Sequence, residues 1–457
     1  MSLRVAVVGS GPSGFFATAQ LLACTDPVFR VDVFDRLPTP FGLVRAGVAP
    51  DHPNIKIVSR VFEKAAARQN MRFFGDVEIG TDLSREDLLA HYHAVIYATG
   101  TAADRRMGIP GEDLAGSHSA TEFVSWYNGH PDFSHLEFDL RRARRVVVVG
   151  NGNVAMDVAR IMALQEEELR GTDIAEHALD LLSNTGFEEI VVLGRRGPAQ
   201  ASFTPPELLE IGALPRADVH VNPVDLRLDP VSAAWLESED APRSNKRNIE
   251  ILGEYALRAP AGRPVRITFA FLRSPVEIIG DEHGRVRSLL VERNEVIDYR
   301  ARGTGAFEEL PCDLVFRSIG YRGVPVPGVP FDDSSGLIRH ESGRVTGEGG
   351  DVRPGEYVTG WIKRGPSGVI GTNKQDSRET VDRLVEDATG GRLHNPHQED
   401  IAHLLRERGR TPVAWRDWQA IDAAERGAGE LRGRPRVKLT DWAALREAGV
   451  PAGRSAQ

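Results

Sequence analysis

Residues 5–14 read VAVVGSGPSG, a β-branched apolar run that leads directly into a glycine-rich turn. Residues 15–22 continue as a helical pattern, so the stretch predicts a strand, a G-x-G-x-x-G turn and a helix. Gly9, Gly11 and Gly14 suit a tight turn that a pyrophosphate can approach without meeting a Cβ atom. Ser13 lies within this turn, where the helix start offers N–H groups and a positive dipole end to phosphates.

An acidic residue follows at the spacing expected of a dinucleotide site. Residues 31–35 read VDVFD, a second strand, and Asp35 comes about 20 residues after the turn. A carboxylate at this place accepts hydrogen bonds from ribose hydroxyls. An ordinary glycine-rich turn of an α/β protein is the alternative, and the strands and helix around the turn favour the nucleotide site.

A second unit of the same kind begins at residue 145. Residues 146–149 are four valines, residues 150–155 read GNGNVA, and a helix is expected over 154–164. The next predicted strand, 189–193, is followed by Arg195 and Arg196. Two guanidinium groups at this strand end suit a 2′-phosphate through charge-assisted bonds, although adjacent charges are more often a solvated surface pair.

The acid in the first unit and the arginines in the second assign the two nucleotides. An unphosphorylated adenosine suits Asp35, and a 2′-phosphate suits the arginines, so FAD in the first site and NADP(H) in the second is the simplest assignment. A nicotinamide gives two electrons as hydride, and a flavin accepts them and passes them on one or two at a time. The sequence therefore predicts electron transfer, with the acceptor left open.

The fold class follows from the order of these units. Residues 356–360 form another predicted strand, and a glycine-rich turn at 365–371 precedes a helix over about 374–386. We predict an α/β fold of two Rossmann-like dinucleotide-binding domains, with the NADP-binding domain (106–324) inserted into a discontinuous FAD-binding domain (1–105 and 325–457). Two further expectations are hairpin strands at 267–271 and 289–293 and a frayed tail at 451–457.

Composition excludes several other classes. The net charge of −9 over 457 residues argues against general nucleic-acid binding. No apolar run reaches the roughly 18 residues of a membrane span, and the scarcity of cysteines favours a reducing cytoplasm as the setting. Cys24 and Cys312 are the only cysteines, too few and too far apart for a C-x-x-C redox pair or a zinc site, and no metal is expected.

Six separated motifs, in order from residue 3 to about 385, together resemble the adrenodoxin reductase type of ferredoxin–NADP reductase. Jointly they are far more specific than either glycine turn alone. The motifs are GSGPSG at 9–14, PFGLVR at 40–45, GVAPDHP at 47–53, GNGNVA at 150–155, GRRG at 194–197 and GWIKRGPSG at 360–368. The chain resembles a bacterial member without an iron–sulfur extension, since neither end carries a cysteine cluster.

The resemblance implies an FAD-dependent enzyme that moves hydride from NADPH to FAD and then single electrons to a small iron–sulfur protein. That partner is a ferredoxin serving a cytochrome P450 or another oxygenase, and the reductase is expected to be a monomer. The family docks acidic partners through a basic face, whereas this chain is net negative. Residues 141–145 and the pair Lys246 and Arg247 are candidate basic patches, or solvated helix and loop ends.

The resemblance also implies the site residues. His52 and Glu210 are implied to lie near the nicotinamide, with a role in positioning and in water-mediated proton supply, since hydride transfer needs no general acid. The FAD contacts that the resemblance implies, besides the residues of the first turn and Asp35, are Leu43, Val77, Trp361, Gly368, Val369 and Ile370. The implied NADP contacts are Asn151, Gly152, Asn153, Val154, Arg195, Arg196 and Glu207, and Gly368 is implied to touch both cofactors.

Two other functions remain open on the sequence. The chain also resembles the small, electron-input subunit of glutamate synthase, although the cysteine-rich N-terminal region of that family is absent. A non-catalytic sensor that binds FAD and NADP is the second alternative. Disulfide reductases are excluded more firmly, because they need a cysteine pair near the flavin.

Overall fold

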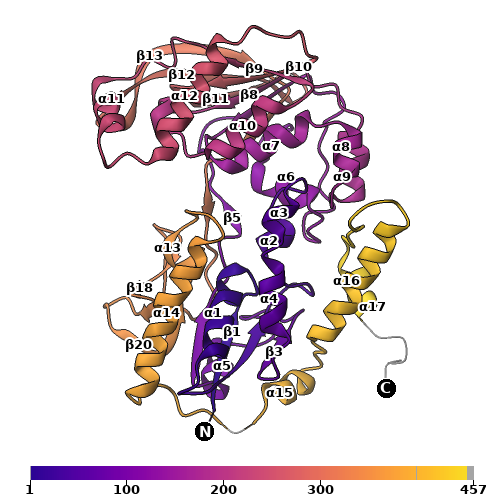
Figure 1. Cartoon of the computed structure of the whole chain (residues 1–457), viewed down its shortest axis with the longest axis vertical. Helices are drawn as coiled ribbons and strands as arrows, with labels where there is room; N and C mark the ends of the chain where they lie inside the picture. The colour runs from indigo at the N-terminus through magenta and orange to yellow at the C-terminus, as the bar shows by residue number, and fades with distance from the viewer. Residues whose placement is uncertain (1, 398, 450–457) are drawn as a thin grey trace. The chain divides into compact units, whose positions relative to one another are not determined.

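The protein divides into two compact units in the computed structural model, which describes residues 2–397 and 399–449. One unit comprises Met1–Ala103 with Tyr321–Gln457, and the other comprises Asp104–Gly320. Figure 1 shows the indigo N-terminal and the orange-to-yellow C-terminal parts of the chain in the same unit. The predicted tail at 451–457 lies outside the described residues.

The first unit is built on a seven-stranded sheet with the order β18-β19-β20-β4-β1-β2-β3. Its strands are β1 (Leu3–Val8), β2 (Phe29–Phe34), β3 (Met71–Phe74), β4 (Ala94–Tyr97), β18 (His340–Glu341), β19 (Arg344–Thr346) and β20 (Val352–Val358). Pairing is parallel from β20 to β3, with Val5 opposite both Val31 and Ala94. The carboxyl ends of these strands therefore share one edge, where open α/β sheets bind ligands.

Helices cover both faces of this sheet because successive residues of β1 point to opposite sides. Val5 and Val7 enter one core with side chains from α1 (Pro12–Ala23), α4 (Ser59–Ala66), α14 (Thr372–Thr389) and α16 (Trp415–Glu430). Ala6 and Val8 enter a second core with side chains from α5 (Arg85–His91) and α15 (Ile401–Glu407). The fold thus places the first glycine turn at the end of a strand buried on both faces.

The second unit contains a six-stranded parallel sheet with the order β6-β14-β7-β8-β10-β9. A large core on one face includes residues of α6 (Ala120–Tyr127), α7 (Asn153–Ala163), α10 (Pro205–Ala213) and α12 (Arg243–Leu257). A three-stranded antiparallel sheet packs on the other face through Ile278, Leu289 and Val291. The strands are β6 (Ser117–Ser119), β7 (Arg145–Val149), β8 (Glu189–Leu193), β9 (Ala217–Val221), β10 (Val265–Ala270), β11 (Arg273–Gly280), β12 (Val286–Ile297), β13 (Arg300–Pro311) and β14 (Leu314–Arg317).

The predicted hairpin of strands at 267–271 and 289–293 is wrong. β10 lies between β8 and β9 in the parallel sheet, whereas residues 289–293 belong to β12, which pairs with β11 and β13. Ile267, Phe269 and Phe271 are spaced two residues apart, so they point to one face of the sheet, and all three are buried in the core on that face. Apolar patterning identified both strands but carried no information on which strands they pair with.

Short elements complete the chain. They are α2 (Leu43–Ala46), α3 (Pro53–Lys56), α8 (Glu166–Arg170), α9 (Glu176–Leu182), α11 (Pro230–Glu237), α13 (Trp361–Arg364), α17 (Trp442–Gly449), the 3₁₀ turn Pro198–Gln200, and the two-residue strands β5 (Ala103–Asp104), β15 (Tyr321–Arg322), β16 (Phe331–Asp332) and β17 (Leu337–Ile338). Among the described residues, no helix is both long and apolar enough to cross a membrane.

Candidate functional site

The first glycine turn joins β1 to α1, and two of its glycines are required by the packing of the chain itself. Gly9 has a φ of +107°, and a Cβ atom there would lie 2.4 Å from the carbonyl oxygen of Ala98. A Cβ atom on Gly14 would lie 2.0 Å from the carbonyl oxygen of Gly9. Neither position accepts a side chain, because the strand, the turn and the helix pack backbone to backbone.

Gly11 differs from these two glycines, because a Cβ atom there would meet nothing within 4 Å. Gly11 is the N-cap residue of α1, and no side chain caps this helix end. An uncapped helix start beside open space is the arrangement that receives a pyrophosphate. The local geometry therefore fits the dinucleotide that the sequence predicts.

Asp35 follows β2 and is tied to the same turn. One carboxylate oxygen accepts hydrogen bonds from the Ser10 amide at 2.9 Å and from its hydroxyl at 2.5 Å, and the other accepts from the Leu37 amide at 2.9 Å. Burial raises the pKa of Asp35 above its ordinary value, although these hydrogen bonds oppose the shift. A carboxylate has about four acceptor positions, so one remains for a ribose hydroxyl.

The segment after β2 folds over the open glycine. The Phe41 amide donates to the carbonyl of Ser10 at 3.0 Å, and a Cβ atom on Gly42 would lie 3.0 Å from the Cα atom of Gly11. Leu43 opens the short helix α2 and is half-buried. Val77 is only 1% exposed, and its amide donates to the Asp35 carbonyl at 3.0 Å.

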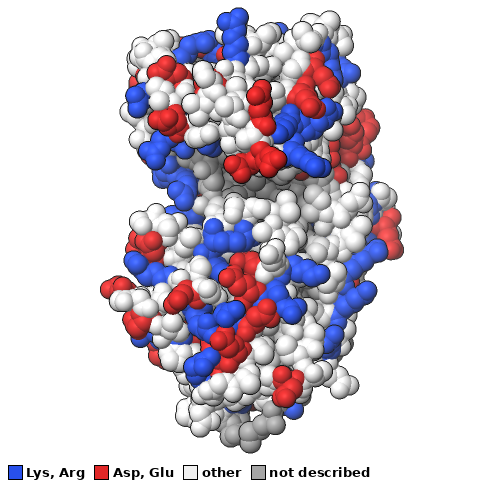
Figure 2. Space-filling model, turned by 60° about the vertical axis from the view of Figure 1, so that its left-hand side comes forward, with Lys and Arg blue, Asp and Glu red and all other residues white. Residues whose placement is uncertain are grey.

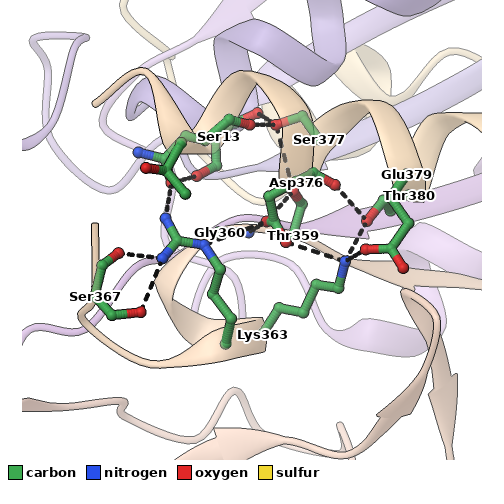
Figure 3. Close-up of polar contacts among 12 residues, drawn as sticks. Ser13, Thr359, Gly360, Lys363, Ser367, Asp376, Ser377, Glu379 and Thr380 are labelled. Carbon is green, nitrogen blue, oxygen red and sulfur yellow. Dashed lines mark hydrogen bonds and ion pairs between the residues drawn. The ribbon is translucent and has the colours of Figure 1, made fainter. Parts of the chain in front are cut away.

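A buried polar network fixes the start of α1 to the C-terminal part of the same unit (Figure 3). The Ser13 hydroxyl donates to Oδ1 of Asn373 at 2.9 Å, and Ser377 donates to the carbonyl of Ser13 at 3.0 Å. The Gly360 amide donates to Asp376 at 2.5 Å. A Cβ atom on Gly360 would lie 2.1 Å from the Ser13 hydroxyl, so the two segments meet without an intervening side chain.

The negative charge of Asp376 in this network is balanced by Lys363 of α13. Lys363 is 4% exposed, and its ammonium lies 3.1 Å from Asp376 and 2.6 Å from Glu379. Arg364 donates a hydrogen bond of 2.9 Å to Oδ1 of Asn373, the same oxygen that accepts from the Ser13 hydroxyl. The motif at 360–368 contains Lys363 and Arg364, but no local pattern indicates their role, because the turn that they support lies at the other end of the sequence.

The implied flavin-end residues lie on α13 and in the turn that precedes α14. The indole nitrogen of Trp361 is buried and has no hydrogen-bond partner among the described residues, and its ring packs 5.6 Å from Tyr321. Val369 is 60% exposed, and its amide donates to Thr372 at 3.2 Å. A buried donor without a partner among the described residues is consistent with a polar ligand beside Trp361.

The second glycine turn repeats the design of the first. Gly150 has a φ of +141°, and a Cβ atom on it would lie 2.1 Å from the carbonyl oxygen of Ser318. A Cβ atom on Gly152, the N-cap residue of α7, would meet nothing within 4 Å. Ala155 stands where the first turn has its third glycine and is fully buried. The second unit therefore has the same open, uncapped helix start as the first.

The asparagines of this turn anchor the chain that follows β8. Oδ1 of Asn153 accepts from the Thr204 amide at 2.8 Å, and the Asn151 carbonyl accepts from the amides of Ser202 and Phe203. Oδ1 of Asn151 is buried and has no protein partner among the described residues. Val154 packs at the edge of the core. Oδ1 of Asn153 is thus used within the protein, whereas Oδ1 of Asn151 can accept a hydrogen bond from a ligand.

Arg195 and Arg196 follow β8, and neither guanidinium forms a hydrogen bond or an ion pair with another described residue. Arg195 is exposed and Arg196 is half-buried. Burial, and then the neighbouring Arg195 charge, lower the pKa of Arg196 below its ordinary value. Two adjacent cations without an anion are electrostatically unfavourable, which favours a phosphate ligand over a solvated pair.

Glu207 and Glu210 lie on α10 and share a buried arginine. Arg160 of α7 is 3% exposed, and its Nη1 atom lies 3.1 Å from Glu207 and 3.4 Å from Glu210. Its Nη2 atom lies 2.8 Å from Asp157. Glu207 is buried, whereas the side chain of Glu210 is 46% exposed. Both carboxylates are thus held in place, and Glu210 retains access to solvent.

His52 belongs to the first unit and is the N-cap residue of α3. Its amide donates to the Ala49 carbonyl at 3.1 Å, and its carbonyl accepts from Ile55 at 3.2 Å. The residue is half-buried. The structure therefore fixes the backbone of His52 at a turn between α2 and α3.

The candidate basic patches are partly neutralised by nearby acids. Arg247 lies 2.7 Å from Glu250 and 3.7 Å from Glu254, and Arg144 lies 3.8 Å from Glu188. Figure 2 shows basic and acidic side chains interspersed over the face in view. Arg141 and Arg145 are exposed, and neither side chain forms an ion pair within the part of the chain that the structure describes.

Comparison with known proteins gives a consistent set of relatives. Residues 3–186 match the model of the pyridine nucleotide-disulphide oxidoreductase family. An NADPH-ferredoxin reductase FprA of Mycobacterium leprae is 48% identical, over 97% of both chains, and a mitochondrial NADPH:adrenodoxin oxidoreductase of Arabidopsis thaliana is 39% identical, over 96% of this chain and 94% of the relative. The solved structure of Mycobacterium tuberculosis FprA in complex with NADPH is 47% identical and matches with a TM-score of 0.91, covering 98% of this chain and 100% of that one.

Proposed function

This chain belongs to the family of NADPH-ferredoxin reductases that includes adrenodoxin oxidoreductase, and from that membership we propose that it is an FAD-dependent NADPH:ferredoxin oxidoreductase. The observation that carries the proposal is the pair of glycine turns whose second glycines, Gly11 and Gly152, face open space at helix starts. Arg195 and Arg196 follow β8 in the second unit, whereas the corresponding strand of the first unit, β2, is followed by Asp35. When bound, the two cofactors supply hydride transfer and the release of single electrons.

The first unit is proposed to hold FAD. Its glycine turn and the start of α1 bind the pyrophosphate, and the network of Ser13, Asn373 and Arg364 keeps that helix start in place. Asp35 takes the adenosine ribose. Trp361 offers its buried N–H group at the flavin end. The further contacts proposed for FAD are Leu43, Val77, Gly368, Val369 and Ile370.

The second unit is proposed to hold NADP(H). Gly152 leaves room for the pyrophosphate, and Asn151 offers its unpartnered acceptor. Arg195 and Arg196 bind the 2′-phosphate, which would supply the anion that they lack. Glu207 positions the ligand while Arg160 balances its charge. Asn153 and Val154 contribute from the first turn of α7.

His52 and Glu210 are proposed to position the nicotinamide and to supply protons through water. Hydride transfer itself needs no general acid, so neither side chain is an obligate catalyst. Glu210 suits proton exchange because it is half-exposed and lies beside the Arg160 guanidinium. Loss of either residue is expected to alter the rate of reduction by NADPH without removing the bound flavin.

The test is anaerobic stopped-flow reduction followed by acceptor assays. The purified protein should contain non-covalent FAD, and NADPH should bleach it much faster than NADH does. Cytochrome c reduction should then accelerate when a ferredoxin is added. A protein without flavin, or flavin that NADPH does not reduce, contradicts the proposal. Rapid bleaching without any acceleration by ferredoxin would instead point to another acceptor, as in the electron-input subunit of glutamate synthase.

A further inference from the structure

The C-terminal part of the first unit, residues 401–449, folds back onto elements near the N-terminus. Gly75 and Val413 exchange both backbone hydrogen bonds at 2.9 Å. Arg446 of α17 binds Asp76 through two nitrogens at 2.7 and 2.8 Å. This segment is thus fixed to the chain immediately after β3, and it contributes Trp418 and Ile421 to the unit's core.

The segment packs against a strained turn. Phe41 has a φ of +85°, which is unusual for an aromatic residue, and its side chain is buried. Its ring centroid lies 6.1 Å from that of Trp415 and 5.8 Å from that of Trp418. Such a backbone conformation persists only where the surrounding structure holds it. Here α16 supplies two of the rings that hold it.

A buried ion cluster fixes the other end of the same turn. Glu425 of α16 has a fully buried side chain, and it binds Arg45 through two hydrogen bonds of 2.9 and 2.5 Å. Arg436 at 3.0 Å and the Leu439 amide at 2.9 Å complete its partners. Burial would raise the pKa of Glu425, but these partners outweigh it and lower the pKa. A buried carboxylate with four donors is a rigid attachment point.

The turn that α16 holds, residues 41–46, packs against Gly11 of the first glycine turn. The Phe41 amide donates to the Ser10 carbonyl, and Gly42 approaches the Cα atom of Gly11 so closely that a Cβ atom would lie 3.0 Å from it. Any loosening of residues 41–46 therefore changes the wall beside Gly11.

We propose that residues 413–445, the C-terminal clamp, keep FAD in its site by holding residues 41–46 against the Gly11 turn. Glu425 acts through Arg45, and Trp415 and Trp418 act through Phe41, so all three are positioning residues. The inference rests on the proposed function, which assigns FAD to this turn. It gives the C-terminal segment a role in cofactor retention that the glycine motifs do not reveal.

The experiment compares full-length Glu425→Gln and Glu425→Ala with the parent holoprotein. Glu425→Gln keeps the size of the side chain but removes its charge, and Glu447→Gln, at an exposed position of α17, is the matched control. The rate of FAD release is measured by flavin fluorescence after dilution, and hydrogen exchange is followed in peptides that cover residues 41–46 and β1. We expect FAD release to be at least tenfold faster in Glu425→Ala than in the parent and intermediate in Glu425→Gln. Relative to the parent, hydrogen exchange should accelerate more at residues 41–46 than in β1.

The readouts separate the clamp from the proposed function. If the parent protein contains no FAD, both the proposed function and the clamp proposal are contradicted. A parent that holds FAD, together with Glu425→Gln and Glu425→Ala variants that release it at the parental rate with unchanged exchange at 41–46, overturns the clamp alone. If Glu425→Ala does not fold, Glu425→Gln decides the matter, and equal acceleration of exchange in β1 and at 41–46 contradicts a local clamp.

Discussion

At the scale of single residues, the arginine pair after β8 makes the sharpest prediction. Arg195→Ala or Arg196→Ala should weaken NADPH binding by about 10- to 100-fold, because a hydrogen bond to a charged group contributes roughly 1.5–3 kcal/mol. NADH lacks the 2′-phosphate and should be almost unaffected. Coenzyme titrations of both variants measure this, with Arg300→Ala on the exposed strand β13 as the control. Equal losses for NADPH and NADH would show that the arginines support structure instead.

A second prediction for a single residue concerns acid stability. Burial would raise the pKa of Asp387, but hydrogen bonds from Arg344 at 2.8 Å, Tyr357 at 2.7 Å and Arg392 at 2.7 Å hold the pKa at about 2. A pKa below its unfolded value, near 4, stabilises the fold above that pH, and the contribution is lost as the pH falls toward 2. Asp387→Asn should therefore lower the free energy of unfolding at pH 7 and flatten its decline between pH 4 and 2. Urea unfolding at several pH values tests this, and Asp382→Asn on the exposed side of α14 should behave like the parent.

At the scale of elements, the two glycine turns separate folding from binding. Gly11 has a φ of −71° and Gly152 a φ of −110°, and a Cβ atom at either meets nothing, so both alanine variants should fold normally. Gly11→Ala should weaken FAD binding, and Gly152→Ala should weaken NADPH binding while FAD is retained. Gly9→Ala should lower the melting temperature, because its Cβ atom would overlap the Ala98 carbonyl. Tight binding of both cofactors by Gly11→Ala and Gly152→Ala would place the pyrophosphates elsewhere.

Sequence predicted the elements well where the signal was local. The apolar runs at 5–8 and 146–149 are signals carried by neighbouring residues, and both form strands, β1 and β7, as predicted. Pairing partners were invisible, as the wrong hairpin involving β10 shows. The contact of α16 with Phe41 joins residues more than 370 positions apart, so no periodicity could reveal it. The site was predicted from motifs, whereas supporting residues such as Asn373 and Asp376 lie outside all six motifs.

At the scale of the whole molecule, net charge is a poor guide to partner binding. The chain carries a charge of −9, yet steering depends on the local field at the docking face. Arg247 and Arg144 have acidic neighbours that cancel much of their field, whereas Arg141 and Arg145 are exposed without such a pair within the described residues. Composition alone could not make this distinction, because it depends on which acids the fold brings beside each arginine.

The last prediction concerns the encounter with ferredoxin. Transient electron-transfer interfaces are small and steered by charge, so transfer should slow as ionic strength rises past about 0.15 M, where the Debye length is about 8 Å. Neutralising Arg141 and Arg145 together should raise the apparent KM for ferredoxin more than neutralising Lys246 and Arg247, because Arg247 is already paired with Glu250. Turnover with ferricyanide should be unchanged in both double variants, since this small acceptor needs no protein docking. Ferredoxin-dependent turnover that is flat across salt and indifferent to all four substitutions would show that neither patch belongs to the docking face.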